Sequence, residues 1–211
     1  MVKNLIAGFS DFKKMFFGTD SSLYENLAKR GQQPKTLVIS CSDSRVDPAT
    51  LFCARPGDLF VVRNVANLVP PYQPDDNYHG VSAAIEFGVR DLGIREIVVL
   101  GHAFCGGIKA LCCHADGQNT DSSEFITPWI KIALPVMDNF DSSAGKKYDI
   151  HEVEKAAIIN SIGNLRTFPW IKDLVELGRL KIHGWWFDME NGALWSYDNN
   201  TNAFYPITEN E

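Results

Sequence analysis

Short apolar runs rich in β-branched residues alternate with helix-like patterns along this chain, and this alternation restricts the fold more than any other feature. TLVIS at 36–40, LFVVR at 59–63 and IVVL at 97–100 have the length and composition of buried strands. Asp47-Pro48 is a typical helix start, a helical pattern covers 82–92 up to Gly93, and another begins near Gly106. Strands that alternate with helices predict an α/β fold with a central, mostly parallel β-sheet flanked by helices.

The first 31 residues have a different pattern and predict an N-terminal helical arm. One helix face is marked by apolar residues at regular spacing: Leu5, Phe9, Phe12 and Phe16. Gly31 is expected to end a second helix over 20–30. Asp11 and the lysines after it interrupt the first stretch, which argues against a signal peptide. We expect the apolar face to dock on this subunit or on a neighbouring one.

The C-terminal third alternates less clearly. Helices are expected over 124–139 and 151–167, with a short one after Pro169 that ends at Gly178. Asn191-Gly192 separates two strand-like runs and predicts a C-terminal β-hairpin, because both residues tolerate positive φ. The 211 residues are expected to form one domain, with the arm at 1–31, a core at 32–115 and C-terminal helices with the hairpin at 116–211.

Charge and hydropathy exclude two classes of partner. The formal net charge of −6 is a poor match for a nucleic-acid backbone, which proteins bind largely through basic side chains. No run approaches the roughly 18 to 20 apolar residues that cross a bilayer, so no membrane partner is expected. Five cysteines are an odd and sparse set for a disulfide framework, which favours a reducing, cytoplasmic location.

Two of the expected strands end in loops that contain metal-ligating residues. Cys41 directly follows the run at 36–40, and His102 and Cys105 follow the run at 97–100. Because ligands bind at the carboxyl ends of parallel strands, these three side chains are expected to converge. Two thiolates and one imidazole match a catalytic zinc site that keeps its fourth position for water. Gly106 and Gly107 would let the backbone approach such a site and would leave N–H groups at a helix start for an anion.

A rival set of ligands is local in the sequence. It combines His102 and Cys105 with Cys112 and either Cys113 or His114. Cys112 and Cys113 are neighbours on an expected helix and would point about 100° apart. We therefore favour the set that contains Cys41 and interpret Cys112 and Cys113 as packing residues.

Asp43 and Arg45 lie in the same turn as Cys41. An aspartate two residues from a metal thiolate could be a fourth ligand, or it could accept a hydrogen bond from metal-bound water. Arg45 can pair with it bidentately and keep it ionised. A loop ion pair of little energetic value is the simpler alternative. The spacing Cys-x3-Arg differs from the Cys-x5-Arg of a cysteine phosphatase loop, which excludes that class.

CSDSR at 41–45 and GHAFCGG at 101–107, with RNVANLVPPY at 63–72 between them, closely resemble the β-class carbonic anhydrases and in particular their plant-type branch. The similarity is dense over 32–111 and looser in the C-terminal third. It implies reversible hydration of carbon dioxide to bicarbonate and a proton. It also implies one Zn²⁺ per subunit on Cys41, His102 and Cys105, with Asp43 and Arg45 as the catalytic pair.

The resemblance further implies substrate-binding residues, which are Gln32, Phe60, Val65, Phe87 and Gly106. The Gln32 amide and the Gly106 N–H would hold an oxygen of bicarbonate or CO2, although Gln33 is adjacent and the register could differ by one. Phe60 and Val65 would form an apolar wall. Phe87 stands where many plant-type members have tyrosine, so a hydroxyl contact is lost there.

Assembly and regulation are also implied by the resemblance. The family dimerises through its N-terminal helices and often assembles further, so a homodimer or a dimer-based tetramer or octamer is expected. A bicarbonate-regulated branch carries tryptophan where this chain has Val38, so an allosteric bicarbonate pocket of that kind is not expected. If the pH falls, Asp43 could move onto zinc as a fourth ligand and close the site.

Three other functions fit parts of the pattern. A carbonyl sulfide or carbon disulfide hydrolase would use the same zinc ligands with a different pocket. A non-catalytic zinc-binding module would need no oriented water, and the presence of Asp43 with Arg45 argues against it. A nucleophilic cysteine enzyme would need a third orienting group beside His102 and Cys105, and none is evident in the sequence.

Overall fold

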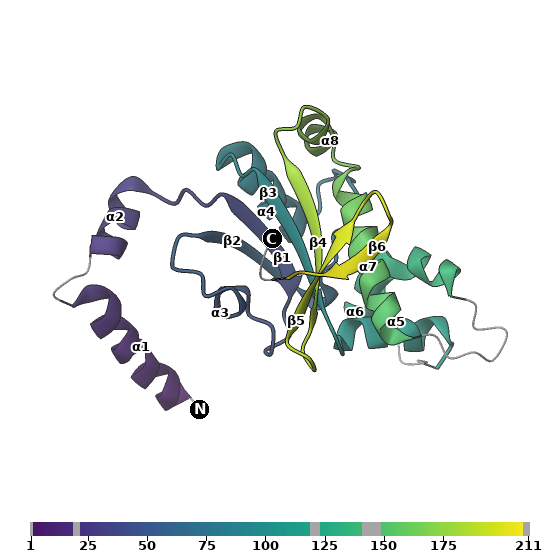
Figure 1. Ribbon diagram of the computed structural model, residues 1–211, viewed down its shortest axis with the longest axis horizontal. Helices are drawn as coiled ribbons and strands as arrows, with labels where there is room; N and C mark the ends of the chain where they lie inside the picture. Colours follow the sequence, from purple (N-terminus) through teal and green to yellow (C-terminus); the bar gives the residue numbers. More distant parts are fainter. Residues whose placement is uncertain (1, 19–21, 119–122, 141–148, 209–211) are drawn as a thin grey trace.

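The computed structural model describes residues 2–18, 22–118, 123–140 and 149–208, and within them six strands form one sheet (Figure 1). The strands are β1 (Thr36–Cys41), β2 (Leu59–Asn64), β3 (Glu96–His102), β4 (Lys181–Asp188), β5 (Ala193–Asp198) and β6 (Ala203–Pro206). Their order is β2-β1-β3-β4-β5-β6. The first four strands are parallel, whereas β5 and β6 add to β4 in antiparallel fashion. The predicted α/β fold with a mostly parallel sheet is confirmed.

Helices connect the parallel strands and form the N-terminal arm. They are α1 (Val2–Phe17), α2 (Ser22–Arg30), α3 (Pro48–Leu51), α4 (Gly80–Glu86), α5 (Gly106–Ala115), α6 (Ile126–Ile130), α7 (Ile150–Leu165) and α8 (Pro169–Glu176), with 3-10 segments η1 (Val65–Asn67) and η3 (Lys131–Asn139) and a π-helical segment η2 (Phe87–Asp91). The helix expected over 124–139 is thus α6 followed by 3-10 geometry, and Pro135, which lacks a backbone N–H, lies in the second part. Within the described ranges, no helix combines the length and apolar character needed to cross a membrane.

The sequence signals at the ends of α3 and η2 act as predicted. Asp47 caps α3, because its side chain accepts a hydrogen bond from the backbone N–H of Thr50 at 2.9 Å, and Pro48 is the first helical residue. Gly93 follows η2 with a φ of +67°, a left-handed conformation that glycine adopts without steric cost. The loop after β1 and the approach to β3 are therefore fixed by local chemistry.

The C-terminal hairpin forms between β4 and β5, but its turn differs from the predicted one. The strands pair up to Asp188 opposite Ala193, and of the Asn191-Gly192 pair only Gly192 has a positive φ, at +64°. The Asp188 carboxylate organises the loop instead, because its Oδ1 accepts hydrogen bonds from the backbone N–H groups of Glu190 and Asn191 at 3.0 and 3.3 Å. Strand β6 extends the sheet beyond the expected hairpin.

Helix α7 covers one face of the sheet at close range. Two strand glycines make this possible. A Cβ at Gly101 of β3 would lie 2.6 Å from Cδ1 of Ile158, and one at Gly184 of β4 would lie 2.8 Å from Cδ1 of Ile162. The buried core on this face joins β1 and β3 to α7 and α8. The close crossing brings α7 beside the carboxyl ends of β3 and β4.

The opposite face of the sheet is more thinly covered. Val38, Val98 and Leu100 are buried there. The side chains above them are themselves only partly buried and include Phe52, Trp185 and Phe187. This face is the one on which the chain's own elements provide the least cover.

The N-terminal arm does not supply the missing cover. Figure 1 shows α1 and α2 extending away from the sheet, and α1 has no buried residue. Phe12 and Phe16 pack on Tyr24 of α2, with ring centroids 5.4 and 5.7 Å apart. Leu5 and Phe9 remain 71% and 62% exposed. Part of the apolar face thus docks on α2 of its own subunit, and the exposed Leu5 and Phe9 are left for a neighbouring subunit.

Candidate metal centre and active site

Two neighbouring strands end in the residues that the sequence predicts as metal ligands. Cys41 is the last residue of β1 and His102 the last of β3, and these strands run parallel with Ser40 opposite Leu100. Cys105 directly precedes the first residue of α5. The Sγ atoms of Cys41 and Cys105 are 3.9 Å apart, and one ligand atom from each of the three residues lies within 4.8 Å of the others. All three side chains are buried at the carboxyl edge of the sheet.

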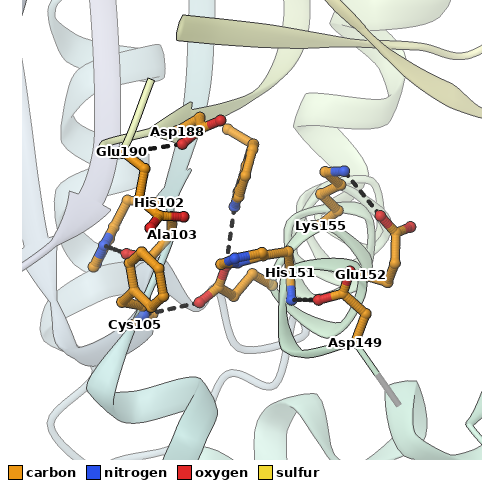
Figure 2. Close-up of polar contacts among 12 residues, drawn as sticks. His102, Ala103, Cys105, Asp149, His151, Glu152, Lys155, Asp188 and Glu190 are labelled. Atoms are coloured by element: carbon orange, nitrogen blue, oxygen red, sulfur yellow. Dashed lines mark hydrogen bonds and ion pairs between the residues drawn. The ribbon is translucent and has the colours of Figure 1, made fainter. Parts of the chain in front are cut away.

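The imidazole of His102 is oriented for metal binding. Its Nδ1 lies 2.9 Å from the carbonyl oxygen of Ala103, so the hydrogen bond places the proton on Nδ1 (Figure 2). Its Nε2 is buried and has no hydrogen-bond partner within the described part of the chain. Buried polar atoms are almost always paired. An unpaired nitrogen lone pair beside two thiols therefore fits a divalent metal ion.

The two thiols influence each other's protonation. The pKa of Cys41 lies below the ordinary cysteine value, chiefly because the Cys105 thiol donates to it and also because the backbone N–H of Ala66 lies 3.4 Å from its Sγ. The pKa of Cys105 is raised by Cys41 and by burial. The metal-free pair thus favours one negative charge rather than two. A bound dication would remove the penalty on the second thiolate.

Asp43 and Arg45 form a bidentate pair at the edge of this site. Nε of Arg45 donates to Oδ1 of Asp43 at 2.9 Å and Nη2 donates to Oδ2 at 2.7 Å, while the Arg45 backbone N–H also donates to Oδ1 at 2.9 Å. Nη2 further donates to the carbonyl oxygen of Phe104 at 3.1 Å, which links the loops after β1 and β3. These hydrogen bonds hold the pKa of Asp43 well below its usual range. The carboxylate therefore remains a hydrogen-bond acceptor at any working pH.

Arg63 restrains the loop after β1 through hydrogen bonds to its backbone. Its Nε donates to the carbonyl oxygen of Cys41 at 3.0 Å, and its Nη2 donates to those of Asp43 and Val46 at 2.7 and 3.1 Å. Its Nη1 also lies 3.2 Å from a carboxylate oxygen of Asp47. One guanidinium thus fixes the backbone that carries both a candidate ligand and the candidate acid–base group.

The rival ligand set does not assemble. Within the described ranges, one group of histidine, cysteine and carboxylate side chains has the spacing of a metal site, and it consists of Cys41, His102 and Cys105. Cys112 is instead buried in the apolar cluster formed by α5, η3 and α7. Cys113 is partly buried on the same helix.

Comparison with known proteins identifies the family of this chain. The sequence profile of the carbonic anhydrase family matches residues 36–194. A carbonic anhydrase of Pseudomonas aeruginosa is 36% identical over 210 residues, which cover 99% of this chain and 93% of the relative. The solved structure of the β-carbonic anhydrase CcaA is 33% identical, with a TM-score of 0.86 over 99% of this chain and 93% of that one. The chain belongs to the β-carbonic anhydrases. A tetrameric β-carbonic anhydrase of the ascomycete Sordaria macrospora is 27% identical, with a TM-score of 0.73 over 92% of each chain.

The substrate-binding residues predicted for this β-carbonic anhydrase fall into two groups. Val65 packs in the same buried cluster as Cys41 and Cys105, and Gly106 is the first residue of α5 beside them. Phe60 instead pairs with Leu37, four residues before Cys41, which places it roughly 13 Å along the sheet from that ligand.

Gln32 and Phe87 are also outside the site of their own subunit. Phe87 packs on Phe60, with ring centroids 6.1 Å apart, and is largely exposed on its other side. Gln32 is exposed in the segment that leads from α2 to β1. Gln32 and Phe60 lie at the amino ends of β1 and β2, and Phe87 packs beside Phe60, whereas the candidate ligands lie at the carboxyl ends of the strands.

Two residues that form hydrogen bonds with the ligand loops were not predicted from the sequence. Arg63 is the charged residue at the end of the apolar run LFVVR, which is the signal that could have marked it. Glu154 is buried on α7, where it accepts a hydrogen bond from the backbone N–H of Cys105 at 2.9 Å. Its signal is an acid flanked by the buried residues Val153, Ala157 and Ile158 on one helix.

Proposed function

We propose that this protein catalyses the zinc-dependent, reversible hydration of carbon dioxide to bicarbonate and a proton. The single observation that carries the proposal is the buried convergence of Cys41, His102 and Cys105, with ligand atoms within 4.8 Å of one another, beside the Asp43–Arg45 pair. Membership of the β-carbonic anhydrases supports the same reaction.

One Zn²⁺ per subunit would be held by the two thiolates and by Nε2 of His102. This donor set is one that zinc prefers, and three protein ligands leave a position for a reacting molecule. Zinc supplies Lewis acidity, which makes a water molecule available as a nucleophile near neutral pH. Two thiolates offset the charge of the ion, so this acidity is weaker than with three neutral histidines.

Asp43 would orient the attacking water and accept its hydrogen bond. Its two oxygens face Arg45, so the side chain is held at a fixed angle and in its ionised form. Arg45 also ties the carboxylate to the Phe104 carbonyl on the other ligand loop. Asp43 as a fourth ligand would have to give up both hydrogen bonds from the Arg45 side chain. The observed pairing supports an open site, and closure at low pH is an alternative state of the same loop.

The remaining substrate contacts would come from both sides of a subunit boundary. The free N–H of Gly106 at the start of α5 is suited to a bicarbonate oxygen, and Val65 offers an apolar surface for CO2. Phe60, Phe87 and Gln32 would then serve the site of a partner.

A homodimer, or a tetramer or octamer built from dimers, is the assembly that this chain's surfaces favour. The thinly covered sheet face and the exposed apolar residues of α1 provide apolar area for a second subunit. The tetrameric relative from Sordaria macrospora has the same fold. All five cysteines lie within the described residues and none forms a disulfide. Thiol ligands favour the reducing cytoplasm.

The test combines metal analysis with a stopped-flow assay of CO2 hydration. The wild type should contain about one zinc per chain. Asp43→Asn should keep its zinc and lose roughly 10²- to 10⁴-fold in kcat/KM, as expected for a group that orients and accepts a proton. Asp11→Asn, on the exposed surface of α1, serves as the control and should not change the rate.

Three results would contradict the proposal. Zinc held by four protein ligands without CO2 hydration would point to a non-catalytic module. Turnover of carbonyl sulfide or carbon disulfide that exceeds CO2 hydration in parallel assays would point to a hydrolase. Full activity of Asp43→Asn would refute the role given to the carboxylate.

A further inference from the structure

A buried carboxylate lies directly behind the candidate ligand Cys105. Glu154 of α7 is only 2% exposed. Its Oε1 accepts a hydrogen bond from the backbone N–H of Cys105 at 2.9 Å. Its Oε2 accepts one from Nε1–H of Trp186 at 3.2 Å and lies 2.9 Å from Nδ1 of His151. Burial of a carboxylate is costly unless donors compensate for lost water. Here three separate elements contribute a donor.

The surroundings of Glu154 hold it in one position. The ring of His151 packs edge-on against Phe104 and Trp186, with centroids 5.0 and 5.4 Å apart. Nζ of Lys155 lies 4.8 Å from the Trp186 ring centroid. Figure 2 shows His151 and Lys155 on α7, with Cys105 and His102 beside the helix. The carboxylate therefore presents Oε1 to the Cys105 loop at a fixed place.

The Cys105 loop has few internal restraints of its own. Only two residues separate Cys105 from His102, and Phe104 between them has a φ of +58°, which is costly for a residue with a side chain. Cys105 is the N-cap of α5, yet no side chain within the loop caps that helix. The Cys105 N–H is instead satisfied from α7, 49 residues further along the chain.

We infer that Glu154 is a positioning residue, which fixes the Cys105 backbone and so directs the Cys105 thiolate at the metal. The inference rests on the proposed zinc function and adds a residue to it. Groups that hydrogen-bond to metal-site residues from outside typically change metal affinity about 10- to 100-fold when they are removed. The alternative is that Glu154 merely anchors α7 to β4 through Trp186.

Two substitutions of Glu154 distinguish the effect of its side-chain length from the effect of its charge. Glu154→Gln keeps an oxygen at the same distance for the Cys105 N–H but removes the charge. Glu154→Asp keeps the charge but shortens the side chain by one methylene, which withdraws the acceptor from Cys105. Glu152→Gln removes a 56% exposed carboxylate of the same helix that pairs with Lys155 and makes no contact with the Cys105 loop, and is the matched control. Trp186→Phe removes the other fixed donor without touching Cys105.

The readouts are zinc affinity by chelator competition and the absorption spectrum of the cobalt-substituted protein, in which thiolate-to-cobalt and d–d bands report ligand geometry. Glu154→Asp should bind zinc about 10- to 100-fold more weakly and show altered bands. Glu154→Gln, Trp186→Phe and Glu152→Gln should stay close to the wild type in both measurements. A weaker zinc affinity in Glu154→Asp alone would show that the hydrogen bond to Cys105, rather than the buried charge, positions the ligand.

A second measurement uses the metal-free protein. Selective ¹⁵N labelling of cysteine gives five backbone amide signals, one for each cysteine. A neutral amide oxygen is a weaker acceptor than a carboxylate. The Cys105 amide proton should therefore move upfield in Glu154→Gln, while the other four stay in place. This signal can be assigned from a Cys105→Ser sample.

Several outcomes would overturn the inference. These are a Cys105 signal that does not move, a Glu154→Asp protein with wild-type zinc affinity and cobalt bands, a reversed order of the two variants, or an equal loss in both variants and Trp186→Phe. A wild-type protein that takes up neither zinc nor cobalt would refute the proposed function instead. The two failures are thus distinguishable.

Discussion

Replacement of Arg63 by methionine should loosen the loop that carries Cys41 and Asp43. The guanidinium donates to three backbone carbonyl oxygens of this loop and pairs with Asp47. Methionine preserves much of the apolar stem but has no donor, so all three carbonyls lose their partner. The loop should then sample other conformations, with loss of both fold stability and catalytic alignment.

The expected loss of stability in Arg63→Met can be estimated from these contacts. Hydrogen bonds from a charged donor contribute about 1.5–3 kcal/mol each, but water can partly replace a donor that is not fully buried. Arg63 is 29% exposed, so we count each carbonyl bond at about 1 kcal/mol. The half-exposed pair with Asp47 adds little. The free energy of unfolding should fall by about 3 kcal/mol, and Tm by roughly 6–12 °C for a chain of this length.

Differential scanning calorimetry at one protein concentration measures this effect, with CO2 hydration measured on the same samples. Arg55→Met is the control, because Arg55 is exposed and its Nε is 3.9 Å from the Asp58 carboxylate. The control should lower Tm by no more than about 1–2 °C. If Arg63→Met has the same Tm as Arg55→Met and keeps full activity, the guanidinium does not hold the loop, and the reasoning is refuted.

Three further predictions concern pH, packing and assembly. Turnover should rise from pH 7 to pH 9, because two thiolate ligands leave the activated water less acidic than three histidines would. The depressed pKa of Asp43 keeps that carboxylate ionised throughout this range, so its titration adds no step to the pH–rate profile. A steady-state rate that is flat from pH 6 to 9 would contradict the ligand assignment. Gly101→Ala should destabilise the fold by about 1–3 kcal/mol in urea unfolding, because its Cβ would meet Ile158 at 2.6 Å, whereas Gly163→Ala, with open space around it, should be neutral or stabilising. Phe9→Lys should reduce the assembly mass in light scattering if a partner covers α1, and an unchanged mass would exclude that face from the interface.

Strands β1 and β3 could be predicted closely from sequence because they are buried on both faces. TLVIS and IVVL carry nothing but apolar and small residues, and β1 and β3 extend only one or two residues beyond them. Strand β6 escaped prediction because it is a four-residue edge strand, AFYP, that itself ends in proline. The hairpin turn was misjudged because the Asp188 side chain, rather than the Asn191 backbone, determines its shape.

The candidate site could be predicted only where it depends on strand ends. Cys41 and His102 end adjacent parallel strands, so topology alone brings them together. Glu154 reaches Cys105 because Gly101 and Gly184 allow α7 to lie close to the sheet. These residues are far apart in the sequence, so they form no short motif from which the contact could be predicted. The position of Phe60 relative to the ligands could not be predicted either, because a sequence motif does not show at which end of the sheet a residue lies.

The parallel pairing of β1 with β3 also has a consequence for when the proposed metal site can form during synthesis. Cys41 and Cys105 are 64 positions apart, and β2 with α4 is made between them. During synthesis at about 5–20 residues per second, Cys41 emerges roughly 3–13 s before Cys105. The ligands meet only after β3 has been added beside β1. Capture of the proposed zinc ion would therefore be a late event in biogenesis, and Cys41 would wait for its partner ligands throughout this interval.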